Sequence, residues 1–356
     1  MDTIYYKNEL LYATFLDNPL LVNLHNNKKY ETNIDVIFSV LNFLETPNNK
    51  ENIVVFLQAE FQLSEEISNE LVKKLVENDL IISQKSDVYK RKISWKEMDW
   101  EPSIIHYTES RNINFEDIGG EEDYSKKQKE YKSLLEVSSS PEFYKKYNTK
   151  YIKLPDIKNK MDVSISEVLL NRKTSRVFKD KPLSIEDLSY ILFYGTFQAR
   201  ELRKYVSSNI EQDQALFTNS LFSSNELYLM ISNVRGVEKG IYHYDMELHG
   251  LHQLKTNIDT SDIGYYCYGQ PEMKNAAVVL FISAEYEKYM WRYRHERAYR
   301  NLLMDVSQLA QSIILATTSN GKKSFLTPAL RDTELVDLFD LVPLKEDIRY
   351  LVAIGE

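Results

Sequence analysis

The chain has 356 residues, 43% of them hydrophobic, and a formal net charge of −9. This length favours two domains, and the acidic balance argues against a protein that coats nucleic acid, because such binding depends on many contacts from lysine and arginine to phosphate. The single cysteine, Cys267, excludes a disulfide framework and a thiolate metal site.

The first 15 residues carry Asp2 and lack both a basic segment and a long apolar segment. We therefore expect no signal peptide. No apolar run approaches the roughly 18 residues of a membrane span. Together with the lone cysteine, these features predict a cytoplasmic protein that binds neither membrane nor nucleic acid.

Residues 1–93 are predicted to form a winged-helix module. Apolar residues recur at helical spacing in 33–45, 50–61 and 63–82, and Ser64 suits the N-cap of the third helix. Residues 80–93 alternate around a polar centre, as a β-wing would. The third helix is too acidic to face phosphates, so we expect it to dock a peptide or to serve packing alone rather than to read DNA. Its acidic residues are Glu65, Glu66, Glu70, Glu77 and Asp79.

Residues 94–160 are predicted to be an aromatic connector followed by a long charged and polar linker. From 161 to 356 the pattern becomes mixed, and the fold class is α+β. Helices are expected at 163–171, 183–197 and 296–321, strands at 226–234, 275–284 and 348–355, and a hairpin at 240–254. Ser184 suits a capping box with Asp187, and Gly321 suits the end of the long helix.

A cluster of positive charge follows the first of these helices. Arg172, Lys173 and Arg176 lie within five residues, together with the hydroxyls of Thr174 and Ser175. Guanidinium and hydroxyl donors this close together suit a phosphate dianion. The alternative is that these cations only complement the dipole at a helix C-terminus.

Three stretches of the sequence carry a family resemblance. "VLLNRKTSRVFKDKPLSIEDLSYILFYG" resembles the opening of the flavin-dependent nitroreductase superfamily. "NELYLMISNVRGVEKGIYHYDMELHGLHQL" and "RAYRNLLMDVSQLAQSIILA" resemble its SagB-type branch, whose members modify ribosomally made peptides. The resemblance covers about 155–356. It implies an FMN cofactor, a homodimer around two flavins, an N-terminal module that binds the leader of a precursor peptide, and contact with other maturation enzymes.

The resemblance also implies roles for individual residues. Arg172, Lys173, Thr174 and Arg176 match the positions that hold the FMN phosphate, and Arg331 lies where the superfamily often adds a further cation. Before the strand at 226–234 the family has a glycine-rich loop that packs on the flavin. Here the glycines are missing, and the polar residues that remain as candidates are Thr218, Asn219 and Ser220.

The second departure concerns the chemistry. Azoline-oxidising members carry a Lys-Tyr pair just before the long helix, but here it falls on Tyr293 and Arg294, or on Arg292 and Tyr293. Arginine stays protonated and is a poor base, although it can stabilise developing negative charge. Tyr293 and the neighbouring His295 are candidate proton donors. The family's Gly-His in the long helix is Ser307-Gln308.

A missing base hinders an oxidation that removes a proton from carbon more than it hinders a reduction. The sequence therefore favours reduction of dehydroalanine or dehydrobutyrine to D-amino acids, as in lanthipeptide maturation. Azoline oxidation to thiazole or oxazole and a non-catalytic peptide-binding scaffold remain alternatives. His243, His249 and His252 are interpreted as sheet and turn residues rather than metal ligands, and Cys267 as a buried, inert thiol.

Overall fold

The structure is a computed structural model. It describes residues 3–14, 20–83, 85–111, 136–139, 141–157, 162–209, 224–256 and 258–356, together with 125–126, 129–130 and Ser133. The chain divides into two compact units, Met1–Phe115 and Glu116–Glu356, and each is described by itself. None of the helices in these ranges is long and apolar enough to cross a membrane.

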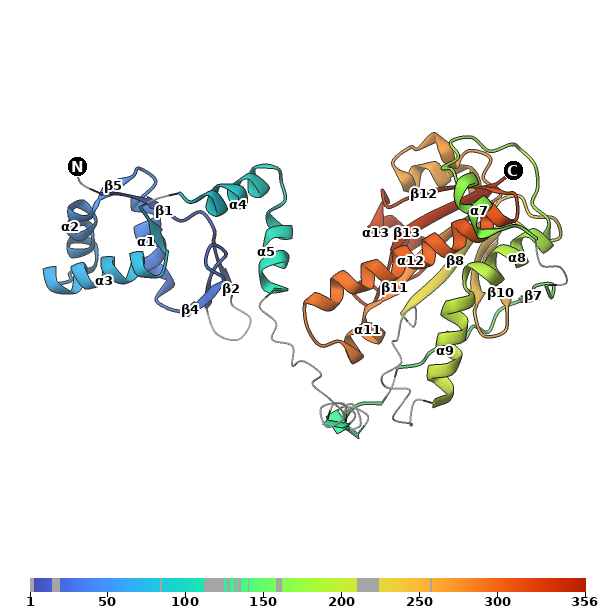
Figure 1. Ribbon diagram of the computed structural model, residues 1–356, viewed down its shortest axis with the longest axis horizontal. Helices are drawn as coiled ribbons and strands as arrows, with labels where there is room; N and C mark the ends of the chain where they lie inside the picture. Colours follow the sequence, from blue (N-terminus) through green and yellow to red (C-terminus); the bar gives the residue numbers. More distant parts are fainter. Residues whose placement is uncertain are drawn as a thin grey trace. The chain divides into compact units, whose positions relative to one another are not determined.

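The N-terminal unit combines small antiparallel sheets with helices (Figure 1). Its strands are β1 (Ile4–Lys7), β2 (Leu11–Thr14), β3 (Leu20–Asn23), β4 (Lys28–Glu31), β5 (Asn48–Asn49) and β6 (Ile81–Ile82). Its helices are α1 (Ile34–Phe43), α2 (Lys50–Phe61), α3 (Glu65–Glu77), α4 (Asp87–Glu97) and α5 (Glu101–Glu109). The strand β1 lies between β5 and β6, and β3 lies between β2 and β4.

Local sequence explains the three helices that were predicted. Asn33, Asn49 and Ser64 each accept a hydrogen bond from a backbone N–H in the first turn of α1, α2 and α3, which satisfies a donor that a helix end leaves unpaired. Their apolar faces share one core with Leu21 of β3. Helices and strands of this kind suit the winged-helix assignment, which stays a prediction.

The predicted wing at 80–93 is wrong, because residues 87–97 form helix α4. Ser86 accepts a hydrogen bond from the Tyr89 N–H and begins the helix. Tyr89 is buried and Ile93 packs beside it, in a second core that includes Ile104 of α5. Residues four apart lie on one helix face. Burial of this pair therefore favours a helix over the strand that the alternating pattern predicts. The compact unit therefore continues through α5 instead of ending at 93.

The C-terminal unit is built on one seven-stranded antiparallel sheet in the order β12-β13-β11-β8-β9-β10-β7. Its strands are β7 (Tyr151–Lys153), β8 (Asn225–Ile231), β9 (Gly240–Asp245), β10 (Gly250–Thr256), β11 (Val278–Glu285), β12 (Lys323–Thr327) and β13 (Glu346–Gly355). The edge strand β7 lies in the segment predicted to be a linker. Three residues are too few to show the alternation from which a strand is predicted.

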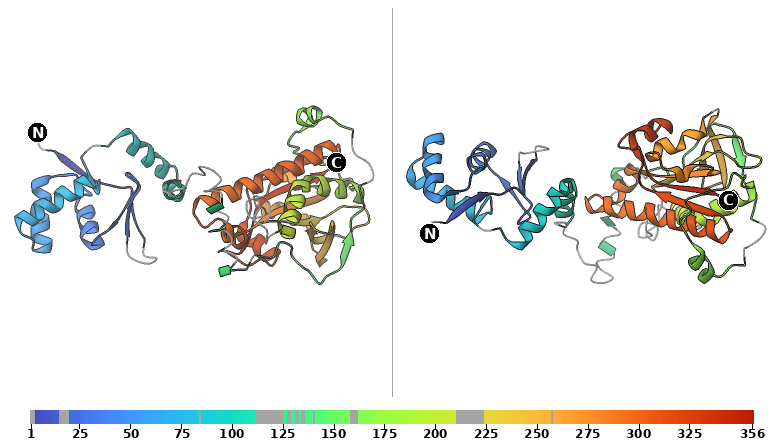
Figure 2. Two further views of the ribbon diagram at one scale, coloured as in Figure 1. Left: turned by 60° about the horizontal axis from the view of Figure 1, so that its bottom comes forward. Right: turned by 90° about the horizontal axis from the view of Figure 1, so that it is seen from above.

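Helices cover both faces of this sheet (Figure 2). The α-helices are α7 (Ile165–Asn171), α8 (Ile185–Gly195), α9 (Phe197–Asn209), α11 (Tyr286–Arg292), α12 (Arg297–Ser319) and α13 (Asp332–Leu338), and the 3-10 helices are η1 (Thr260–Cys267) and η2 (Pro271–Met273). The predicted helices, strands and hairpin of this unit are therefore present, and the α+β class is confirmed.

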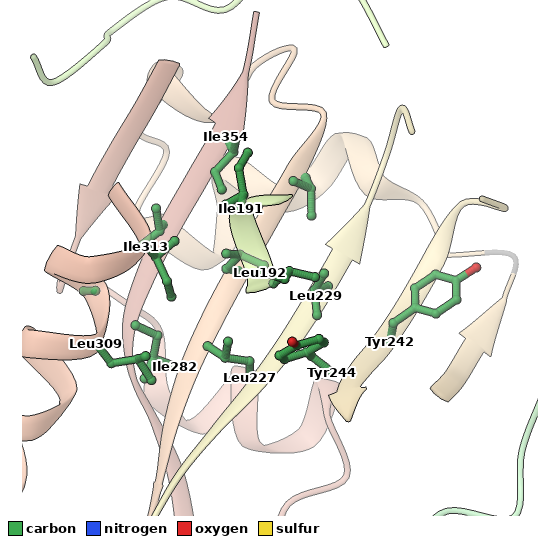
Figure 3. Close-up of a cluster of buried hydrophobic side chains, with 14 of the residues drawn as sticks. Ile191, Leu192, Leu227, Leu229, Tyr242, Tyr244, Ile282, Leu309, Ile313 and Ile354 are labelled. Atoms are coloured by element: carbon green, nitrogen blue, oxygen red, sulfur yellow. The ribbon is translucent and has the colours of Figure 1, made fainter. Parts of the chain in front are cut away.

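Alternation along the buried strands gives each face its own core. Leu227 and Leu229 of β8 pack with Ile313 of α12 and with residues of α8 (Figure 3). Tyr228 and Met230 point to the opposite face, where α13 and η1 pack. Successive side chains of a strand point to opposite faces, so a strand buried on both sides carries a continuous apolar run, as β8 does at 227–231 and β11 at 278–282.

The packing of α8 against α12 depends on a glycine. A Cβ atom added at Gly195 would lie 2.9 Å from the Ile313 Cα. We expect Gly195→Ala to lower the free energy of unfolding by about 1–3 kcal/mol through overpacking. Urea denaturation checks this against Gly264→Ala, whose added Cβ has its nearest neighbour at 3.7 Å. Equal stabilities of the two variants would contradict the close contact.

Candidate active site

The positively charged segment 172–176 is anchored at both ends. It follows α7, whose start is fixed by a capping box between Ser164 and Glu167. Thr174 bridges to Ser324 at the start of β12, and the Ser175 N–H donates to the Ser324 carbonyl at 2.8 Å. Beyond the cluster, the buried Phe178 packs against Gly355 of β13. The backbone is therefore held while the polar side chains remain accessible.

These side chains differ in their partners. Lys173, Thr174 and Arg176 are exposed and Arg172 is half-buried. The Arg176 guanidinium donates to Glu272 Oε1 at 2.6 Å. Within the part of the chain that the structure describes, no carboxylate lies within 4 Å of a charged nitrogen of Arg172 or Lys173.

Arg331 lies at the N-cap of α13. Its Nε donates to the Tyr265 carbonyl at 2.9 Å, and its guanidinium lies over the rings of Tyr265 and Tyr268. The η1 and η2 helices thus supply partners for both Arg331 and Arg176, since Tyr265 lies in η1 and Glu272 in η2.

This donor set fits a phosphate dianion. Arg172 and Lys173 offer charge-assisted donors, and Thr174 adds a hydroxyl on the same anchored backbone. Glu272 orients Arg176 and also competes with an anion for it. The candidates Thr218, Asn219 and Ser220 lie outside the described residues, so the fit to FMN concerns its phosphate group alone.

A cavity of about 960 Å³ opens between α11, the start of α12 and the start of β13. Tyr293, Arg294 and His295 line it, together with Tyr289 and Leu302. Arg292 is not among the lining residues, and its guanidinium lies over the Tyr293 ring at 5.5 Å. Three of the four predicted catalytic residues therefore line one cavity, and Arg292 does not; the roles of all four stay predictions.

Sequence reasoning missed two residues beside this cavity. Asp305 of α12 is buried, and the Tyr289 side chain is hydrogen-bonded to it. Burial raises the pKa of Asp305 to about 6, although the Tyr289 hydrogen bond opposes the shift. Burial, followed by the charge of Asp305, also raises the pKa of Tyr289. An acidic residue in the apolar stripe of an otherwise regular helix was the available signal.

A Lys-Tyr pair, Lys288 and Tyr289, lies four or five residues upstream of the two predicted registers. Tyr289 lines the large cavity, whereas the Lys288 Nζ lies 3.0 Å from Glu285 Oε2 and 3.3 Å from Glu226 Oε1. Lys288 is therefore held in an ion network and is not presented to that cavity.

That network is centred on the fully buried Glu226 of β8. Its carboxylate contacts Arg203 at 3.0 Å and His243 at 2.9 Å, in addition to Lys288. Burial alone would raise the pKa of Glu226, but Arg203, the His243 hydrogen bond and Lys288 outweigh burial and hold it well below its usual range. Lys145, from the segment predicted to be a linker, forms ion pairs with Glu285 and Glu346 beside it.

The histidines of the hairpin have protein partners. His243 bonds to Glu226, His249 bonds to Ser189 and Tyr244, and His252 bonds to Asp245. Among the described residues, no group of three His, Cys, Asp or Glu side chains is arranged to hold a metal ion. Cys267 is buried, and burial raises its pKa to about 12, so the thiol is not activated.

The cation cluster and the cavity lie at opposite ends of α12 within one chain. Figure 1 shows α7 near the C-terminal end of α12 and α11 at its start. The helix has 23 residues, which is roughly 34 Å at 1.5 Å per residue. Along β13, Ser324 pairs with Ile354, seven positions from Asp347 of the cavity, which is roughly 23 Å.

Comparison with known proteins decides the family. The nitroreductase family model matches residues 169–356. The chain belongs to the nitroreductase family. It is 30% identical over 295 residues to the trifolitoxin operon protein TfxC of Rhizobium leguminosarum bv. trifolii, covering 79% of this chain and 78% of TfxC. It is 29% identical over 210 residues to MJ1384 of Methanocaldococcus jannaschii, covering 58% of this chain and 97% of that protein.

Two solved structures show weaker similarity. A nitroreductase-type protein from Anabaena variabilis is 21% identical with a TM-score of 0.49, covering 62% of this chain and 44% of that chain. A chain of the Escherichia coli microcin synthetase McbBCD complex with truncated pro-MccB17 bound is 17% identical with a TM-score of 0.39, covering 69% and 85%.

The family match confirms the predicted class of a nitroreductase-fold, flavin-dependent oxidoreductase. The match to TfxC extends well beyond the length of the family model and supports the resemblance to the SagB-type branch.

Proposed function

We propose that this nitroreductase-family chain binds FMN and modifies a ribosomally made precursor peptide, reducing dehydroalanine or dehydrobutyrine residues to D-amino acids. The anchored cation cluster at Arg172, Lys173 and Thr174 carries the cofactor part of this proposal, because its donors suit a single phosphate group. TfxC, named for the trifolitoxin operon, and the resemblance to the SagB-type branch support the peptide substrate.

The residues that line the cavity support reduction as the direction of the reaction. Tyr293, Arg294 and His295 line it without a lysine, and Lys288 nearby is held by Glu226 and Glu285. When bound, reduced flavin supplies a hydride, and the cavity then needs only a proton donor. Azoline oxidation is the alternative, and it needs a base at the same place.

The direct test offers the reduced protein two precursor peptides, one bearing dehydroalanine and one bearing thiazoline, and measures their masses. Gain of two hydrogens by the dehydroalanine peptide supports the proposal. Loss of two hydrogens from the thiazoline peptide with the oxidised protein supports the alternative. A protein that binds peptide but changes neither mass would be a scaffold.

We further propose that the working enzyme is a homodimer in which each flavin site combines the cation cluster of one subunit with the cavity of the other. The separation of these features within one chain, roughly 34 Å along α12 and roughly 23 Å along β13, supports this arrangement. Large apolar side chains are exposed around the cluster, as a surface covered by a second copy would be, and they are Ile165, Leu169, Leu170 and Val177.

The N-terminal unit is proposed to dock the leader of the precursor peptide in a groove between α1 and α3. The groove has a volume of about 650 Å³ and is lined by Val36, Ile37, Phe61, Leu63, Ile67 and Leu71, with Glu66, Glu70 and Lys74 at its polar positions. Thr32, which directly follows the edge strand β4, also lines the groove, and an edge strand can pair with an extended peptide.

A charge placed in this groove should weaken docking. We expect Ile67→Asp to raise the Kd of the precursor peptide by a factor of about 10 or more, because it puts a carboxylate among apolar contacts. Titration calorimetry measures this change. Val55→Asp is the matched control, since Val55 is equally accessible on α2 but does not line the groove. Equal binding by both variants would place docking elsewhere.

A further inference from the structure

Asp305 is an acidic residue in an apolar environment. It lies on the buried stripe of α12 with Leu302, Val306 and Leu309, and only 4% of its surface is exposed. Its Oδ2 has no hydrogen-bond partner among the described residues. A buried carboxylate oxygen without a partner is costly, so a protonated carboxyl is favoured there more than at the surface.

Tyr289 connects this carboxyl to the large cavity. Its side chain is hydrogen-bonded to Asp305 and also lines the cavity. Its ring packs against that of Tyr293 with centroids 4.9 Å apart, and the charge of Arg292 acts on its hydroxyl. Tyr289 therefore connects the buried Asp305 carboxyl to the wall of the cavity.

The groups around Asp305 explain its proton affinity. Burial is the main cause of its raised pKa of about 6, and Tyr289 is the titratable side chain that acts on it directly. Tyr293 and Arg292 face Tyr289 from the same segment. A group that titrates near neutral pH can give and take a proton under ordinary conditions.

We propose that Asp305, acting through the Tyr289 hydroxyl, holds the proton that the reduction in this cavity consumes; this inference rests on the proposed function. In reduction, a substrate carbon–carbon double bond gains one hydride and one proton. Bound reduced flavin supplies the hydride with its two electrons.

The proton then moves along two hydrogen bonds. Tyr289 gives its hydroxyl proton to the second substrate carbon while the Asp305 carboxyl gives its proton to the Tyr289 oxygen. Tyr289 ends neutral and Asp305 ends as a carboxylate, which water in the cavity reprotonates through Tyr289.

This makes Tyr289 the residue that touches substrate and Asp305 a positioning residue that stores the proton. Because this pair supplies the proton, a reduction in this cavity does not need a lysine at the Tyr293–Arg294 position. If the pair were only structural, its protonation would not be coupled to turnover, so a pH profile separates the two roles.

The test measures the infrared carboxyl band of the flavin-free, full-length protein labelled with ¹³C-aspartate, across the pH range around 6. We expect a band that titrates near pH 6 in the wild type, is absent in Asp305→Asn and is retained in Asp337→Asn, whose carboxylate is exposed on α13. We expect the midpoint to rise in Tyr289→Phe, because the Tyr289 hydrogen bond lowers the pKa of Asp305.

The second readout is the pH dependence of the single-turnover rate of the flavin-loaded enzyme. Asp305→Asn should remove the change in single-turnover rate near pH 6, and Asp337→Asn should retain this change. The inference is overturned if Asp305→Asn retains the titrating band, if Tyr289→Phe leaves its midpoint unchanged, or if an active Asp305→Asn enzyme keeps the wild-type pH profile. A chain that shows the titration but never binds flavin would instead contradict the proposed function.

Discussion

Replacing both Arg172 and Arg176 by alanine is expected to weaken flavin binding by a factor of about 100 or more while the fold stays intact. Hydrogen bonds to a charged group contribute about 1.5–3 kcal/mol each, so two lost guanidinium partners correspond to about 3 kcal/mol or more. Both side chains project from a backbone that Thr174, Ser175 and Phe178 anchor to the sheet. The fold therefore does not depend on their charge.

Flavin fluorescence titration of the apoprotein measures this loss of affinity, and circular dichroism checks the fold. Lys179→Ala is the matched control, because Lys179 is an exposed cation three residues beyond Arg176 and outside the cluster. Arg176→Ala alone should have the smaller effect, since Glu272 already competes for that guanidinium. A double variant that kept the wild-type affinity would disprove the phosphate assignment.

Replacing Arg203 by alanine is expected to lower the free energy of unfolding by about 3–5 kcal/mol, because it leaves the carboxylate of Glu226 buried without its main cation. Arg203 is 1% exposed, and its guanidinium contacts Glu226 at 3.0 Å and the Asn225 carbonyl at 2.6 Å. Lys288 and His243 remain as partners of Glu226. These two partners prevent a larger loss of unfolding free energy.

Urea denaturation at several pH values measures both the size and the sign of this effect. The folded-state pKa of Glu226 lies below its ordinary value of 4.5, so its stabilising contribution is present above pH 4.5 and is lost as pH falls through the folded-state pKa. Arg203→Ala should raise that pKa and reduce the contribution. Arg200→Ala, one turn earlier on α9, is the control and should cost less, because Arg200 contacts the Met246 carbonyl and the Phe193 ring rather than a carboxylate. An equal loss in both variants would contradict the assignment.

The elements that could be predicted from the sequence carry strong local signals. Helix α8 begins with a capping box at Ser184 and Asp187, and α12 ends before Gly321, whose φ is positive. Strands β8 and β11 contain continuous apolar runs, at 227–231 and 278–282. By contrast, α4 was mistaken for a strand because Tyr89 and Ile93 become a buried face only when β2 and β3 pack against it, which a local pattern does not reveal.

The candidate site was predictable where its residues are contiguous. Arg172, Lys173, Thr174 and Arg176 form one short motif, so their proximity follows from the sequence. Tyr289 and Asp305 come from two helices, and only folding brings them into contact. Arg203 and Glu226 likewise meet through the packing of α9 beside β8. Such pairs require tertiary structure.

The most direct test of the central claim is the visible absorption spectrum of the freshly purified, full-length protein, with any released cofactor identified by chromatography. The account predicts a yellow protein that carries FMN at a ratio near one per chain. A colourless protein that also fails to bind added FMN would contradict it, and would favour a peptide-binding scaffold instead.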